Sequence, residues 1–141
     1  MKITLSVCQV QDLSNTQVRQ LKKLCRKNGQ LSDILSHLLY RIKHNLPTYT
    51  HRVVLAAKGE MIVGWAMMFK YPNYNYTELM LYVKRAYRRM GIGSSLLTKA
   101  KGLRRGLRMP KLRIYPMRDQ GDFFLKNRLT TQKEYERVQT L

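Results

Sequence analysis

The stretch RRMGIGSS, residues 88–95, decides the fold because it joins an apolar run to a run with helical character. The apolar run is LMLYV, residues 79–83, and the helix-like run is LLTKA, residues 96–100. A strand, a glycine-containing turn and a helix in this order direct several backbone N–H groups toward one point, where the helix dipole adds partial positive charge. The stretch therefore predicts an anion site at a strand-to-helix junction.

Two familiar phosphate motifs do not fit this stretch. Gly91 and Gly93 begin the pattern G-x-G-x-x-G, but Leu96 stands where the third glycine belongs. The acidic residue expected about 20 positions later is also missing, since no acid occurs between Leu79 and Arg118. No Gly-Lys-Ser/Thr follows either, which excludes a P-loop. What remains is a strand, a basic turn with glycines and a helix start, a site that would suit a pyrophosphate. Arg88 and Arg89, together with Lys84 or Arg85, would supply charge beside the backbone amides.

The rest of the chain predicts an α/β domain that spans residues 1–141. A helix follows the first strand, with Asp12 or Ser14 as its cap, and Asn28-Gly29 is expected to end it. The second, third and fourth strands should form an antiparallel meander, with a tight turn at Lys58–Glu60. In chain order we expect a strand, two helices, three strands, a helix, a strand and a short helix, over residues 3–10, 14–28, 31–44, 51–58, 60–70, 77–83, 94–107, 111–117 and 118–129.

Charge is the unusual feature of the composition. Lys and Arg number 27 against 8 Asp and Glu, a formal net charge of +19. Such a field favours a polyanionic partner, either nucleic acid or an acidic protein, although solubility alone is the alternative explanation. No apolar run approaches the roughly 18 residues of a membrane span, and the N-terminus lacks the pattern of a signal peptide. We therefore expect a cytoplasmic protein without a membrane partner.

The potential metal ligands do not form a recognisable set. Cys8 and Cys25 have no metal-ligand spacing, and two cysteines are too few for a disulfide framework. His37, His44 and His51 recur every seven residues, but no acidic or thiol cluster accompanies them. We expect no metal site.

The segment LYVKRAYRRMGIGSSLL, residues 81–97, resembles motif A of the GNAT superfamily of acetyl-CoA-dependent N-acetyltransferases. The family pattern Gln/Arg-x-x-Gly-x-Gly/Ala is matched by Arg88 through Gly93. The order of elements agrees over roughly residues 50–126, and residues 1–46 fit the family's opening strand and paired helices. The resemblance implies a GNAT fold, with a mixed, mostly antiparallel central sheet flanked by helices. Its C-terminal end should be shortened, because the 15 residues from Asn127 are few for the two usual last strands.

The resemblance also implies acetyl-CoA as the cofactor. Its pantetheine arm would pair with the backbone of Leu81, Tyr82 and Val83. Its pyrophosphate would lie on the turn and the first helical residues, with Arg88 adding charge beside the amides of Arg89, Met90, Gly91, Ile92, Gly93 and Ser94.

The chemistry implied is direct attack of a primary amine on a thioester. A base is useful because such an amine is mostly protonated at neutral pH, and Glu78 is the only acid between Glu60 and Asp119. A strand-end carboxylate that merely offsets basic charge is the alternative for Glu78. The family's usual tyrosine acid is replaced by Phe124, so Tyr115, Tyr82 or solvent would protonate the leaving thiolate.

The acceptor is not identified by the sequence, and three functions stay open. One is an N-acetyltransferase acting on a nucleic-acid-associated protein or a modified base. Another is a nucleic-acid-binding module with weak catalysis, and the third is a protein that targets a partner and keeps the coenzyme as a structural ligand. The tyrosines of YPNYNY, residues 71–76, are expected beside the acceptor, and the C-terminal segment is compatible with an oligomer contact.

Overall fold

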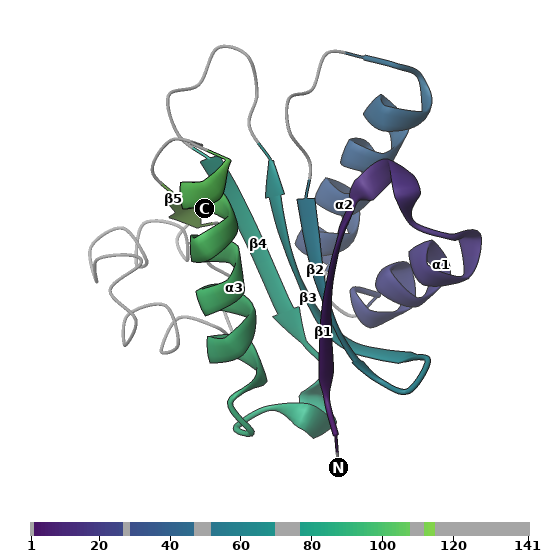
Figure 1. The fold of residues 1–141 in the computed structure, drawn as a ribbon. Helices are drawn as coiled ribbons and strands as arrows, with labels where there is room; N and C mark the ends of the chain where they lie inside the picture. Colours follow the sequence, from purple (N-terminus) through teal and green to yellow (C-terminus); the bar gives the residue numbers. More distant parts are fainter. Residues whose placement is uncertain (1, 27–28, 47–51, 70–76, 108–111, 115–141) are drawn as a thin grey trace, which may run out of the picture.

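The computed structural model describes residues 2–26, 29–46, 52–69, 77–107 and 112–114. Within these ranges, five strands form one sheet, and three α-helices and two short 3-10 helices surround it (Figure 1). The elements in chain order are β1 (Thr4–Gln9), η1 (Val10–Asp12), α1 (Asn15–Leu24), α2 (Gly29–Lys43), β2 (Arg52–Lys58), β3 (Met61–Phe69), β4 (Thr77–Val83), η2 (Arg85–Tyr87), α3 (Ile92–Gly106) and β5 (Leu112–Ile114).

The sheet has the strand order β1-β2-β3-β4-β5. The pairs from β1 to β4 are antiparallel, whereas β4 and β5 are parallel. The predicted mixed, mostly antiparallel sheet is thereby confirmed, as is the hairpin turn, where Gly59 has a φ of 62°. The strand expected over residues 111–117 is described only at 112–114, and the helix expected over 118–129 lies outside the described residues.

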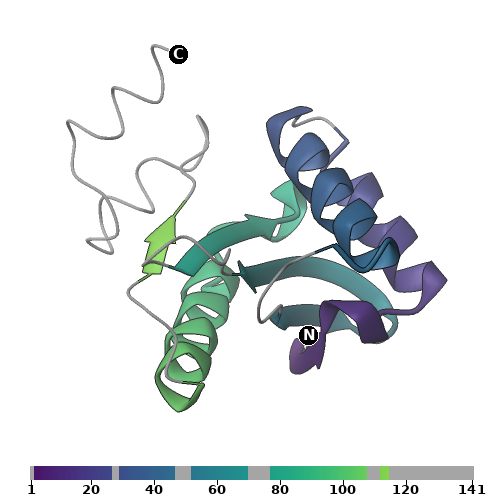
Figure 2. The same cartoon turned by 90° about the horizontal axis from the view of Figure 1, so that it is seen from above.

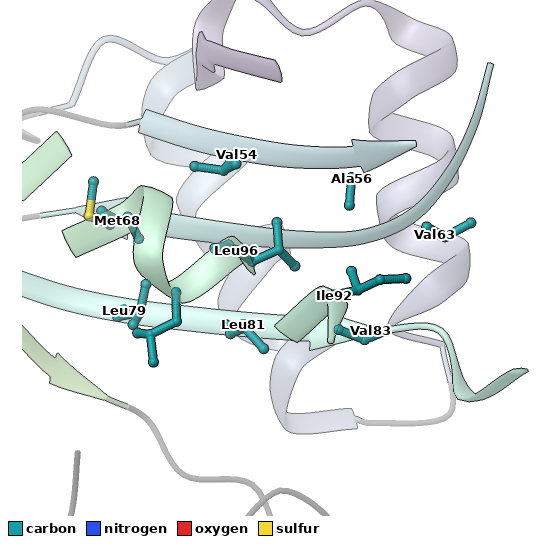
Figure 3. Close-up of a cluster of buried hydrophobic side chains, with 12 residues drawn as sticks. Val54, Ala56, Val63, Met68, Leu79, Leu81, Val83, Ile92 and Leu96 are labelled. Atoms are coloured by element: carbon teal, nitrogen blue, oxygen red, sulfur yellow. The ribbon is translucent and has the colours of Figure 1, made fainter. Parts of the chain in front are cut away.

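The helices cover both faces of the sheet (Figure 2). The helix α3 packs on one face through Ile92, Leu96, Leu97 and Ala100, which meet buried side chains of β2, β3 and β4 (Figure 3). On the other face, Leu21 and Cys25 from the α1 region and Leu35 of α2 pack against a second set that includes Trp65, Met67 and Met80. The two cores explain why β2, β3 and β4 are apolar on both sides.

The start of α1 is fixed by a reciprocal cap. The Ser14 hydroxyl accepts a hydrogen bond from the Gln17 N–H at 3.1 Å, and the Gln17 side chain accepts one from the Ser14 N–H at 2.9 Å. Of the two predicted caps, Ser14 is therefore the one used, since Asp12 belongs to η1. The predicted end of this helix was wrong, because α1 stops at Leu24 and Gly29 begins α2 instead. A tight last turn, in which Arg26 donates its N–H to the Lys23 carbonyl at 3.3 Å, ends the helix early.

Candidate active site

The strand β4 lies between β3 and β5 and presents different side chains to the two faces of the sheet. Leu79, Leu81 and Val83 belong to the core under α3. Met80 and Tyr82 pack on the face covered by α1 and α2, and strand alternation places Glu78 on that face as well. Glu78 and Tyr82 are half-buried while their neighbours are buried. Met80 and Tyr82 therefore lie on the common face predicted for them, to which strand alternation also assigns Glu78.

The backbone N–H and C=O groups of β4 also alternate in direction, toward β3 at one residue and toward the β5 side at the next. Lys84 donates its N–H to the Val63 carbonyl at 2.7 Å, and the register pairs Tyr82 with Trp65. Hydrogen-bonded and non-hydrogen-bonded pairs alternate along an antiparallel ladder, so the backbone groups of Tyr82 pair with β3. Those of Leu81 and Val83 point to the other side, toward β5. This geometry favours Leu81 and Val83 over Tyr82 for backbone contacts with a ligand.

Among the described residues, the parallel strand β5 pairs with the first half of β4. The described pairs run from Thr77 opposite Leu112 to Leu79 opposite Ile114, and Glu78 lies opposite Arg113 in this register. Leu81 and Val83 therefore lie past the described end of β5.

The turn after β4 takes two left-handed residues. Arg89 has a φ of 63° and Gly91 a φ of 82°. A Cβ built on Gly91 would meet nothing within 4 Å, so the turn requires glycine here for its conformation and not for space. Arg89 and Met90 are exposed at the tip of the turn. The chain is therefore exposed to solvent from Arg89 to Gly91, directly before the start of α3.

The first turn of α3 leaves backbone donors available. The helix starts at Ile92, two residues before the predicted start, and its first i to i−4 bond runs from the Ser95 N–H to the Gly91 carbonyl at 3.0 Å. The N–H groups of Ile92, Gly93 and Ser94 precede this bond and have no acceptor in the helix. Together with the dipole they form a site for an anion, which fits the predicted pyrophosphate cradle.

The basic side chains near the turn have separate positions. The half-buried Arg88 folds back so that its Nε donates to the Val83 carbonyl at 2.9 Å, and its guanidinium lies 5.3 Å from the centre of the Tyr82 ring. The ammonium of Lys84 lies 4.0 Å from the sulfur of Met61. Arg85 and Arg89 are exposed. Arg88 therefore holds the end of β4, whereas Arg85 and Arg89 are the exposed cations of this turn.

Gly64 on β3, opposite Val83, is a residue next to this site that the sequence did not reveal. Gly64 on β3 lies so close to β4 that an added Cβ would be 3.0 Å from the Tyr82 carbonyl oxygen and 3.3 Å from a methyl of Leu96. An isolated glycine inside an apolar strand is the signal that could have revealed it. Gly64 allows β3, β4 and α3 to approach one another directly behind the turn.

The described surface also has an open groove of about 650 Å³ between α3 and β1. It starts at Ser94 and Ser95 and reaches Gly102, with Leu5 on its opposite wall. Because β1 and β5 are at opposite edges of the sheet, the groove lies on the far side of α3 from the β4–β5 junction. It is therefore separate from the backbone site at Leu81 and Val83.

Other classes of site find no support in the described ranges. No group of three or more metal-ligating side chains occurs among the described residues. No described helix is long and apolar enough to cross a membrane. Tyr115, Phe124 and the tyrosines of residues 71–76 lie outside the described residues.

The fold agrees with that of known acetyltransferase structures. PaiA N-acetyltransferase from Thermoplasma acidophilum, solved with coenzyme A, has a TM-score of 0.63 at 20% identity, over 90% of this chain and 89% of that one. A predicted acetyltransferase from Clostridium acetobutylicum, solved with acetyl-CoA, has a TM-score of 0.67 at 13% identity, over 94% and 93%. An aminoglycoside acetyltransferase from an uncultured soil metagenomic sample, solved with sisomicin, has a TM-score of 0.64 at 16% identity, over 92% and 88%.

No curated protein sequence matches the chain significantly. The sequence model of the acetyltransferase (GNAT) family, in contrast, matches residues 16–115, which include both sides of the turn and most of the sheet. The match covers well over half of the chain, and acetyl-CoA is the cofactor of this family. The chain therefore belongs to the GNAT family of acetyltransferases.

Proposed function

We propose that the protein transfers an acetyl group from acetyl-CoA to a primary amine, at the end of β4. The observation that carries this proposal is the junction itself: the backbone of Val83, whose N–H points away from β3, leads into the open amides at the start of α3. Strand-like backbone contacts for an extended ligand arm and amide donors for its pyrophosphate would thus follow each other along the chain. Leu81, Val83 and the residues from Arg89 to Ser94 would hold the cofactor, and Arg88 would fix the strand end between them.

The bound cofactor supplies an activated thioester whose carbonyl carbon accepts the amine. The Val83 N–H faces the β5 side and would donate to the carbonyl oxygen on which negative charge develops, which is the usual large contribution of an oxyanion site. The Val83 carbonyl, in the next peptide group, already accepts from Arg88, so the backbone on the C-terminal side of this N–H is restrained before the ligand arrives.

Glu78 is the proposed base. An amine of the lysine type has a pKa of about 10.4 and is mostly protonated at neutral pH, so a carboxylate that accepts its proton promotes the reaction. Glu78 is half-buried at the start of β4, on the face that also carries Tyr82. Tyr115 follows the described end of β5 directly in sequence and stays the proposed acid for the leaving thiolate.

The charge of the chain bears on the acceptor. With +19 overall, a free polyamine would be repelled, whereas an amine on an acidic protein or on a nucleic-acid-associated molecule would be attracted. We therefore propose that the acceptor is an amine on an acidic protein or on a nucleic-acid-associated molecule, and not a free polyamine.

Two measurements on the whole protein test this function. Saturating acetyl-CoA should raise the melting temperature by mass action, and absence of any shift would overturn the cofactor site. Turnover should then be followed over a panel of amines, with Glu78→Gln compared against Glu60→Gln, which removes an exposed carboxylate at the β2–β3 turn. We expect Glu78→Gln to lower kcat by about 100-fold while the cofactor still binds. Equal turnover of the two variants would remove Glu78 as the base.

A further inference from the structure

We propose that the outer face of α1 binds the phosphate backbone of a nucleic acid. Four exposed cations share this face and are called the α1 basic stripe: Arg19, Lys22, Lys23 and Arg26. The first three belong to α1, and Arg26 follows its C-cap, Cys25. At 100° per residue the positions i, i+3, i+4 and i+7 fall within an arc of about 100°. This surface is separate from β4 and does not depend on acetyl transfer.

The stripe is carried by a helix that is held firmly on the sheet. On the inner side of α1, Leu21 and the adjoining Cys25 are fully buried against the sheet. Gln20 ties the helix to the β2–β3 turn, because its side chain donates to the Glu60 carbonyl at 3.2 Å and accepts from the Ile62 N–H at 2.8 Å. With the cap at Ser14, the start, the middle and the inner face of α1 are fixed. The cations are therefore presented from a rigid support, with only their side chains left to order on binding.

Structural roles account for only part of this charge. Lys22 and Lys23 stand in the last turn of α1, where they favourably oppose the helix dipole. The Nε of Arg19 donates to the Asn15 carbonyl at 3.4 Å, within the helix itself. No acidic residue occurs between Leu13 and Arg26, so the helix contains no ion pair of its own. Among the described residues, no ion-pair partner is found for Lys22, Lys23 or Arg26.

The spacing of the stripe suits a nucleic-acid strand. With a rise of 1.5 Å per residue, the stripe extends over about 10 Å. A strand of duplex DNA carries one phosphate per 3.4 Å along the axis, so three or four phosphates fall within the same length. The remaining exposed residues of α1, Asn15 and Thr16, are small and polar. A protein partner would ordinarily need a buried apolar or aromatic anchor, which this face does not offer. Backbone binding without sequence preference is what the face supports.

The test uses the full chain without coenzyme and a fluorescein-labelled 20-base-pair DNA duplex of arbitrary sequence. Anisotropy gives the Kd at salt concentrations from 50 to 200 mM. Four phosphate contacts predict that the Kd of the wild type weakens by about 100-fold over this range. Lys22→Gln/Lys23→Gln/Arg26→Gln should reduce this change to less than about 10-fold, because only the contact of Arg19 remains. Lys22→Gln alone should lower the slope of log Kd against log salt by about 0.9.

The matched control removes two lysines and one arginine from α3, on the opposite face of the sheet: Lys99→Gln/Lys101→Gln/Arg105→Gln. We expect its salt dependence to equal that of the wild type. An equal loss in both triple variants would mean binding by net charge alone and would overturn the α1 site. Full competition by polyglutamate at equal charge concentration would point to an acidic protein and also overturn it, as would absence of binding at 50 mM salt. A duplex RNA of the same length distinguishes the two sources of phosphate, and circular dichroism melts verify that each variant is folded.

Discussion

The side chain of Arg88 is hydrogen-bonded to the strand that precedes it, with 2.9 Å between its Nε and the Val83 carbonyl oxygen. The same guanidinium lies 5.3 Å from the Tyr82 ring centre, a cation–π distance. One residue of the turn therefore restrains both the backbone and a side chain at the end of β4. Arg88 supports the proposed cofactor site indirectly, through its contact with Val83, whereas the neighbouring Arg89 is exposed to solvent.

Replacing Arg88 by Gln should weaken both the fold and the cofactor site. Loss of a partly exposed charged hydrogen bond costs about 1 kcal/mol, which corresponds to a decrease of a few degrees in Tm. The Kd for acetyl-CoA should rise about fivefold, because the Val83 peptide loses its restraint. Arg89→Gln is the matched control: it should leave the Tm unchanged and weaken the cofactor in a salt-dependent way. Thermal melts with and without cofactor measure both effects, and an unchanged Tm for Arg88→Gln would contradict the assigned contact.

Two glycines of the same region should respond oppositely to alanine. Gly91 has a φ of 82°, so Gly91→Ala should lower the free energy of unfolding by about 1 kcal/mol and weaken acetyl-CoA binding. Gly102 lies inside α3 with nothing within 4 Å of an added Cβ, so Gly102→Ala should raise the free energy of unfolding by about 0.5–1 kcal/mol. Urea unfolding of the two variants measures the difference. Destabilisation of equal size in both would show that the left-handed turn is not what requires Gly91.

The pattern of apolar residues was enough to predict the order of strands and helices as far as β5, and the shared face of Met80 and Tyr82. These features depend on local periodicity, which the sequence displays directly. The end of α1 was missed because Gly29 suits either the end of one helix or the start of the next, and the tight turn at Arg26 has no clear sequence signal. Local pattern therefore predicts elements better than their limits.

Contacts between distant residues were beyond the sequence. Gln20 bonds to the β2–β3 turn 40 positions later, and nothing in its neighbours distinguishes it from a solvent-facing glutamine. Arg88 was expected to face the pyrophosphate, but its folded-back side chain depends on a three-dimensional turn that composition does not reveal. The motif predicts a strand, a turn and a helix start, which the structure has, while the direction of the Arg88 side chain required the structure.

Gly64→Ala should destabilise the fold without touching the turn. The added methyl group would lie 3.0 Å from the Tyr82 carbonyl oxygen, and a backbone atom cannot move aside as a flexible side chain can. Separation of β3 from β4 should lower the free energy of unfolding by about 1–3 kcal/mol. Urea titration measures this, with Gly102→Ala as a control for adding a methyl group in open space. A neutral result would mean that the strands adjust freely at this point.

The buried thiol of Cys25 should make the fold sensitive to alkaline pH. Burial raises the pKa of Cys25 from 9.0 to about 12, and the nearby Trp65 indole N–H opposes this rise only in part. Because the raised pKa belongs to the folded state, the stabilising effect is complete below pH 9 and is lost as the pH rises from 9 toward 12. The free energy of unfolding should therefore fall by up to about 1.4 kcal/mol per pH unit in this window. In Cys25→Ala this contribution is absent, so the difference between the two proteins should shrink above pH 9. Urea unfolding at pH 8, 9 and 10 measures it, and a constant difference would show that the thiol ionises equally in both states.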